Sequence, residues 1–114
     1  MNYLIMDKLI SSGQKNYEDF KKKLTSSIIP LLDIIRSYCL SLGTDVIEDV
    51  RMHRIVFCKS FSFRFFADIE PQNDSLIIKM YFGRKKPQKI IKLKANENMD
   101  KVKNLLYEAY NSIH

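Results

Sequence analysis

The chain has 114 residues, of which 46% are hydrophobic and 28% charged, and its formal net charge is +6. This length and composition predict one globular domain over residues 1–114, with residues 1–14 as a flexible or peripheral N-terminal segment. No apolar run reaches the roughly 18–20 residues of a membrane-spanning helix, and no secretory signal pattern opens the chain. We therefore expect a cytoplasmic protein without a membrane partner.

Two helices are predicted in the first part of the chain. The segment NYEDFKKKL, residues 16–24, repeats apolar side chains at helical spacing, and Asn16 is placed to cap it. The segment SSIIPLLDIIRSYCLSLG, residues 26–43, carries a longer apolar stripe, with Ser27 as the expected cap and Gly43 at its end.

From Thr44 onward the apolar period changes to two, which predicts strands. We expect five strands, at residues 45–51, 54–60, 61–70, 75–82 and 89–94. Alternation in the third strand predicts a core face of Phe61, Phe63, Phe65, Ala67 and Ile69. It leaves on the other face Ser62, Arg64, Phe66, Asp68 and Glu70. The fourth strand is expected to point inward with Leu76, Ile78, Met80 and Phe82.

The last predicted element, residues 98–113, is an amphipathic helix. Its apolar stripe consists of Val102, Leu105, Leu106, Ala109, Tyr110 and Ile113. N-terminal helices, then an antiparallel meander of about five strands, then a helix predict an α+β fold with the C-terminal helix packed on one face of the sheet. The helical residues expected to meet the sheet in the core are Ile35, Leu42, Leu106 and Tyr110. The opposite face is expected to be partly open, because its residues mix polar and aromatic side chains.

Asp68, Glu70 and Lys79 follow the order of carboxylates and lysine found in metal-dependent nucleases. Such a site needs an acidic residue two positions before its lysine, where the carboxylate holds the metal and the lysine reaches the attacking water. Ile77 occupies that position. A solvated ladder of charges, with Arg64 on the same face and Lys79 across the hairpin, explains the two carboxylates equally well, so we expect no catalytic site here.

Other chemistries find no support in residue spacing. No Cys-x-x-Cys, His-x-x-x-His or Glu-x-x-His pattern is present, and three glycines do not supply a phosphate-binding loop. Cys39 and Cys58 fall in a predicted helix and strand, which favours buried, reduced thiols and a cytoplasmic setting. We therefore expect no enzymatic activity, metal, cofactor or small-molecule substrate.

The positive charge is concentrated in one segment. Residues 75–96 contain seven bases and no acid, whereas the rest of the chain contains 12 bases and 13 acids. Cations beside exposed aromatic rings suit nucleic acid, DNA or RNA, because the cations bind phosphates and the rings stack on bases. The candidate binding residues are Arg64, Phe66, Lys79, Tyr81, Arg84, Lys85, Lys86, Lys89, Lys92 and Lys94.

A structural explanation of this segment is also open. The lysines would keep an exposed edge strand soluble and unpaired, and Phe66 and Tyr81 would pack under a neighbouring element. Two functional hypotheses therefore stand beside each other: a small nucleic-acid-binding accessory module, or a protein-interaction module, as a homodimer or with a partner enzyme that it regulates.

At LGTDVIEDV, RIVFCK and FADIEPQNDSLIIKMYF the chain resembles a small uncharacterised prokaryotic domain-of-unknown-function family, sometimes labelled predicted transport proteins. In that family a helix ends at Leu-x-x-Gly/Asp-Asp-Val, and an aromatic-x-x-Ile-x-Pro segment precedes an amphipathic strand. The resemblance covers about residues 17–113. It implies an α+β accessory module without assigned catalytic residues; members often follow a nuclease-like domain, which we do not expect in this chain. The turn GRKKPQK is more basic than the family pattern.

Overall fold

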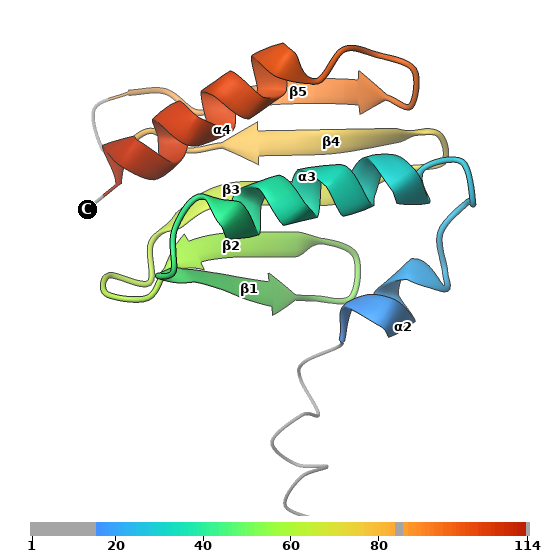
Figure 1. The fold of residues 1–114 in the computed structure, drawn as a ribbon, viewed down its shortest axis with the longest axis horizontal. Coiled ribbons are helices and arrows are strands. Elements are labelled where there is room, and N and C mark those ends of the chain that lie inside the picture. Colours follow the sequence, from blue (N-terminus) through green and yellow to red (C-terminus); the bar gives the residue numbers. More distant parts are fainter. Residues whose placement is uncertain (1–15, 84–85, 114) are drawn as a thin grey trace, which may run out of the picture.

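A five-stranded antiparallel sheet forms one layer of the fold, and helices form the other (Figure 1). The computed structural model describes residues 16–83 and 86–113. The strands pair in chain order and are β1 (Val46–Val50), β2 (Ile55–Lys59), β3 (Phe65–Pro71), β4 (Ser75–Met80) and β5 (Lys89–Lys94). The helices are α2 (Tyr17–Lys21), α3 (Ile29–Ser41) and α4 (Asp100–Ser112). The predicted α+β meander is confirmed, while the predicted peripheral segment, residues 1–14, lies outside the described residues.

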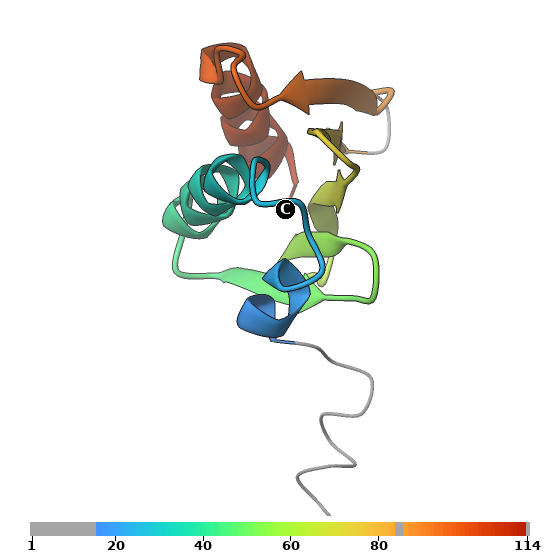
Figure 2. The same ribbon diagram turned by 90° about the vertical axis from the view of Figure 1, so that its right-hand side faces the viewer.

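The two longer helices lie on the same face of the sheet, as the turned view makes clear (Figure 2). Helix α4 contacts β3 and β4, and α3 contacts β1 and α4. Each helix buries one apolar stripe: Leu31, Leu32, Ile35 and Cys39 in α3, and Val102, Leu105, Leu106 and Ala109 in α4. Burying a large aliphatic side chain contributes about 1.5–3 kcal/mol, so these stripes hold the two layers together.

The helix ends match the sequence only in part. Asn16 caps α2 as predicted, because its side-chain oxygen accepts a hydrogen bond of 2.8 Å from the backbone N–H of Asp19. The predicted cap Ser27 is wrong: α3 begins after Ile28, which makes no side-chain capping bond. Gly43 follows the end of α3, and its missing Cβ leaves room for the Tyr110 hydroxyl, which donates to the Asp45 carboxylate.

The core lies between the helices and one face of the sheet. Leu76, Ile78 and Met80 of β4 are fully buried, as their alternation predicts. Ile55 and Phe57 of β2 join them in the same cluster. Of the four helical residues predicted to meet the sheet, Ile35 and Leu106 are fully buried. The other two, Leu42 and Tyr110, are partly buried at its margin.

The predicted face assignment for the first half of the third strand is wrong. Phe66, expected on the open face, is fully buried in the core. Its ring lies 6.4 Å from that of Phe57 and makes an edge-on contact with Tyr110 at 5.4 Å between centroids. Phe57 pairs with Ala67 and Cys58 pairs with Phe65, so Phe66 is an extra residue in β3. A β-bulge of this kind breaks the alternation, and both Phe66 and Ala67 point to the helices.

Three predicted core residues lie outside the core, Phe65 because of this bulge and Phe61 and Phe63 because they precede the strand. Strand β3 begins only at Phe65, and residues 60–64 form the loop that joins it to β2. The side chains of Phe61, Phe63 and Phe65 are 92%, 70% and 41% exposed. We call residues 60–65, which are this loop and the first residue of β3, the aromatic loop.

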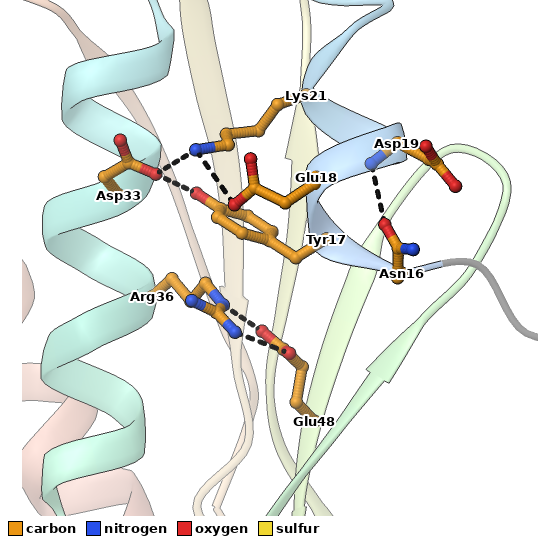
Figure 3. Close-up of polar contacts among 8 residues, drawn as sticks. All are labelled: Asn16, Tyr17, Glu18, Asp19, Lys21, Asp33, Arg36 and Glu48. Carbon is orange, nitrogen blue, oxygen red and sulfur yellow. Dashed lines mark hydrogen bonds and ion pairs between the residues drawn. The ribbon is translucent and has the colours of Figure 1, made fainter.

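A polar network joins α2 to α3 and β1 (Figure 3). The Arg36 guanidinium donates to both carboxylate oxygens of Glu48, at 2.5 and 3.0 Å, and lies 4.0 Å from the centre of the Tyr17 ring. The Tyr17 hydroxyl donates to Asp33 at 2.5 Å, and Lys21 binds the same carboxylate at 3.3 Å. Burial, together with the bond to Asp33, raises the pKa of Tyr17 far above its ordinary range. These contacts compensate for the short length of α2.

Candidate nucleic-acid interface

The face of the sheet opposite α3 and α4, here called the open face, has a basic half on β4 and β5. Residues that pair across antiparallel strands share a face. Lys92 pairs with Ile77 and Lys94 with Ser75, while Lys79 pairs with Ile90. Because Leu76 and Ile78 face the helices, these three lysines all lie on the open face. The structure thus brings Lys79, Lys92 and Lys94 together, as strand parity predicts.

These three lysines form no ion pair within the described parts of the chain. Lys79 lies directly opposite Asp68 on β3, yet no ion pair joins them. The Glu97 carboxylate, which lies just after β5, accepts from the backbone N–H of Lys94 at 2.7 Å and not from its ammonium group. The three ammonium groups therefore remain available to an external anion.

Tyr81 follows the basic half along the chain and is half-buried. Burial raises the pKa of its phenol, and the nearby Asp68 carboxylate raises it further. The ring consequently stays neutral well above physiological pH. A neutral phenol presents both a flat face for stacking and a hydroxyl for hydrogen bonding.

The other predicted binding residues do not all join this surface. Phe66 is excluded, because it is buried among core side chains. Lys89 pairs with Met80 and so belongs to the opposite face of β5, although it is exposed. Lys86 is exposed in the turn before β5. Arg64 lies in the aromatic loop rather than on a strand. The remaining two, Arg84 and Lys85, lie outside the described residues.

The other half of the open face, on β1 to β3, is electrically balanced. Arg54 binds Asp68 at 3.1 Å and Glu70 at 3.5 Å, and Arg51 binds Asp49 at 3.0 Å. Asp68 is only 7% exposed, and one of its carboxylate oxygens has no hydrogen-bond partner among the described residues. The prediction that Arg64 pairs with these carboxylates is therefore wrong, since Arg54 binds both Asp68 and Glu70. Aligning the β2–β3 hairpin would have found Arg54, since Ile55 pairs with Ile69.

These contacts bear on the nuclease pattern. Asp68 and Glu70 share one guanidinium, which occupies the place where a metal would have to bind both carboxylates. Within residues 16–83 and 86–113, no group of three or more potential ligands is arranged to hold a metal ion. Cys39 and Cys58 are buried free thiols. Burial raises the pKa of both, so they remain protonated and poorly nucleophilic at neutral pH.

An open groove of about 500 Å³ borders the aromatic loop. Its lining consists of Phe63, Arg64, Phe65, Tyr81, Gly83 and Ile113. The Arg51 guanidinium lies 5.2 Å from the centre of the Phe65 ring. The sequence prediction missed this feature because strands 54–60 and 61–70 were placed end to end. A hairpin needs at least a two-residue connection, and that requirement was the available signal.

No family model matches the sequence, and no curated protein or solved structure is significantly similar to it. The resemblance to the prokaryotic family therefore stays a prediction. In the described parts of the chain, no helix combines the length and the apolar character needed to cross a bilayer. The fold defines an α+β protein whose sheet is covered by helices on one face.

Proposed function

We propose that this protein is a non-enzymatic module that binds nucleic acid through the basic half of its open face. The observation that carries this proposal is the grouping of Lys79, Lys92 and Lys94 on one face, without carboxylate partners among the described residues, next to Tyr81. Lysines in such a row neutralise phosphates, whatever the base sequence. The buried free thiols support a reducing location, and we propose the cytoplasm.

The basic turn enlarges this surface in the proposal. Lys86 is exposed before β5, and Arg84 and Lys85 precede it in the sequence. In the proposal these three residues also bind phosphates. Lys89, on the other face of the edge strand, would contribute to long-range attraction more than to direct contact.

The test is a binding titration against DNA and RNA over a series of salt concentrations. Reversing Lys79, Lys92 and Lys94 to Glu should weaken binding to all sequences. Each lost phosphate contact should flatten the logarithmic salt slope by roughly 0.7–0.9. A matched control reverses three exposed lysines on the helices and their connection, Lys22, Lys23 and Lys101. This control makes the same change in net charge, so equal weakening by both triple variants would refute a local site.

A second candidate function is supported by the aromatic loop. Exposed aromatic side chains commonly mark contacts with a protein partner, and Phe61 and Phe63 are the most exposed large apolar residues described. In this alternative the protein is an interaction module, as a homodimer or with an enzyme that it regulates. Sedimentation of the purified protein tests this candidate. A stable dimer, together with no nucleic-acid binding at low salt, would favour it.

A further inference from the structure

We propose that the aromatic loop, residues 60–65, and the groove beside it form a subsite for unpaired bases, which makes single-stranded nucleic acid the preferred ligand. This inference rests on the proposed nucleic-acid function and goes beyond it, because phosphate contacts alone do not distinguish single strands from duplexes. The subsite adds Phe61, Phe63 and Phe65, three rings that sequence periodicity assigns to the core.

The first observation is that three aromatic rings are presented to solvent on one short loop. Phe61 and Phe63 have few neighbours to stabilise them, since 92% and 70% of their surface is exposed. Phe63 also adopts a left-handed backbone conformation, with φ of 53°. For a bulky residue this backbone conformation is unfavourable. The loop thus combines a strained backbone position with exposed rings.

The second observation is that the groove is built by elements that converge at one end of the sheet. The β2–β3 loop, the end of β4 and the last turn of α4 all lie at this end (Figure 1). The Lys59 ammonium donates to the Ile113 carbonyl at 2.5 Å and lies over the Tyr110 ring at 4.1 Å. These contacts tie the end of α4 to β2, so one wall of the groove is already in place before a ligand arrives.

The third observation is the charge of the groove. Among the described residues that line it there is one cation, Arg64, and no acidic side chain. Arg51 places a second guanidinium next to Phe65, but the Asp49 carboxylate pairs with it. The groove therefore suits a ligand that combines flat apolar surfaces with negative charge. An unpaired nucleotide has both, because its base stacks on rings or guanidinium planes and its phosphate is anionic.

The groove is continuous with the basic half of the open face. Tyr81 lines the groove, and Lys79 stands two residues before it on β4, about 7 Å away along the strand. A single strand lying along β4 would place its phosphates near Lys79, Lys92 and Lys94, with bases reaching Tyr81 and the aromatic loop. A duplex could use only the lysines, because its bases are stacked inside.

The charge also disfavours a second copy of the chain as the occupant. A two-fold contact through this groove brings the same surface patch together from both subunits. Arg64 would then face its own counterpart, in a protein whose net charge is already +6. Such like-charge contacts oppose association.

The test uses two probes, a short single-stranded oligothymidylate and the duplex that it forms with oligoadenylate. Both are titrated at one fixed salt concentration. The variants Phe61→Ala and Phe63→Ala should each weaken binding of the single strand, by roughly 5- to 150-fold for each stacked base that is lost. Both variants should bind the duplex with an affinity within about twofold of the wild type, because the duplex contacts the protein only through its phosphates. Tyr107→Ala is the matched control, because Tyr107 is another exposed aromatic residue but lies on α4.

The variant Phe63→Trp supplies a direct readout. The chain contains no tryptophan, so the new indole is the only one, and stacking on a base should quench its emission. The single strand should quench it while the duplex should not. Tyr107→Trp reports from the control position and should respond to neither probe.

The outcomes separate this inference from the proposed function. If charge reversal of the three lysines weakens both probes but the aromatic variants weaken neither, the base subsite is wrong and the proposed function stands. If the wild type binds neither probe at low salt, both fail. If the aromatic variants instead dissolve a dimer, or abolish binding to an acidic protein without affecting oligothymidylate, the groove is a protein contact and the inference is overturned.

Discussion

Phe66 lies in the core because it is itself the extra residue of the bulge in β3. Its ring contacts Phe57 and Tyr110, whereas Phe61, in the same aromatic run, is almost fully exposed. We therefore expect Phe66→Ala to lower the free energy of unfolding by about 3–5 kcal/mol. Phe61→Ala should change it by less than about 0.5 kcal/mol. Denaturant titration of both variants measures the difference, and equal effects would contradict the assigned bulge.

At the scale of the element, α2 depends on its side-chain network more than on its own backbone. A five-residue helix has little intrinsic stability, and the pairing of Arg36 with Glu48 fixes α3 to β1 beneath the Tyr17 ring. Arg36→Ala should lower the free energy of unfolding by about 1.5–3 kcal/mol, as expected for charged hydrogen bonds. Tyr17→Phe, which loses only the bond to Asp33, should cost about 1 kcal/mol.

Lys22→Ala is the control for this prediction. Lys22, which directly follows α2, pairs with Asp19 in that helix, but its side chain is 76% exposed. Exposed pairs of this kind contribute little, so the variant should unfold like the wild type. A double-mutant cycle of Arg36→Ala and Glu48→Ala should yield a coupling free energy of at least about 0.5 kcal/mol. Strict additivity would show that the pair does not act as a unit.

At the scale of the whole molecule, buried thiols and phenols make the fold sensitive to alkaline pH. The pKa of Cys39 is raised by burial, and the pKa of Tyr17 by burial and by Asp33. A raised folded-state pKa gives stability that is complete below the ordinary value and is lost as pH rises through the folded value. The ordinary values are 9.0 for the thiol and 10.0 for the phenol.

We therefore expect the melting temperature to fall as pH is raised above about 9, with no comparable fall between pH 7 and 8. Thermal melts over this range measure the effect. Tyr17→Phe should reduce the slope above pH 10, because it removes one group whose ionisation favours the unfolded chain. If the slope is unchanged in this variant, the phenol of Tyr17 ionises as readily in the folded protein as in the unfolded chain.

The sequence by itself determined the order and type of the elements and the inward faces of β4 and α4. Their periodicity is local: a helix or a strand without irregularity repeats its pattern along its whole length. The basic half of the open face was predictable for the same reason, because Lys79, Lys92 and Lys94 lie on regular strands. The concentration of positive charge in residues 75–96 was likewise visible without any structure.

Only the tertiary structure decided which rings are buried and which cations are paired. One extra residue inverts every face assignment before it, and the bulge at Phe66 exists only in the pairing of β3 with β2. Arg54 meets Asp68 across that same pairing. Phe61 and Phe63 are exposed because β2 ends at Lys59 and β3 begins at Phe65, which leaves both in the connecting loop. The apolar period of a single strand does not reveal how it pairs with its neighbour. That pairing fixes where β2 ends and β3 begins, and so defines the aromatic loop and the groove.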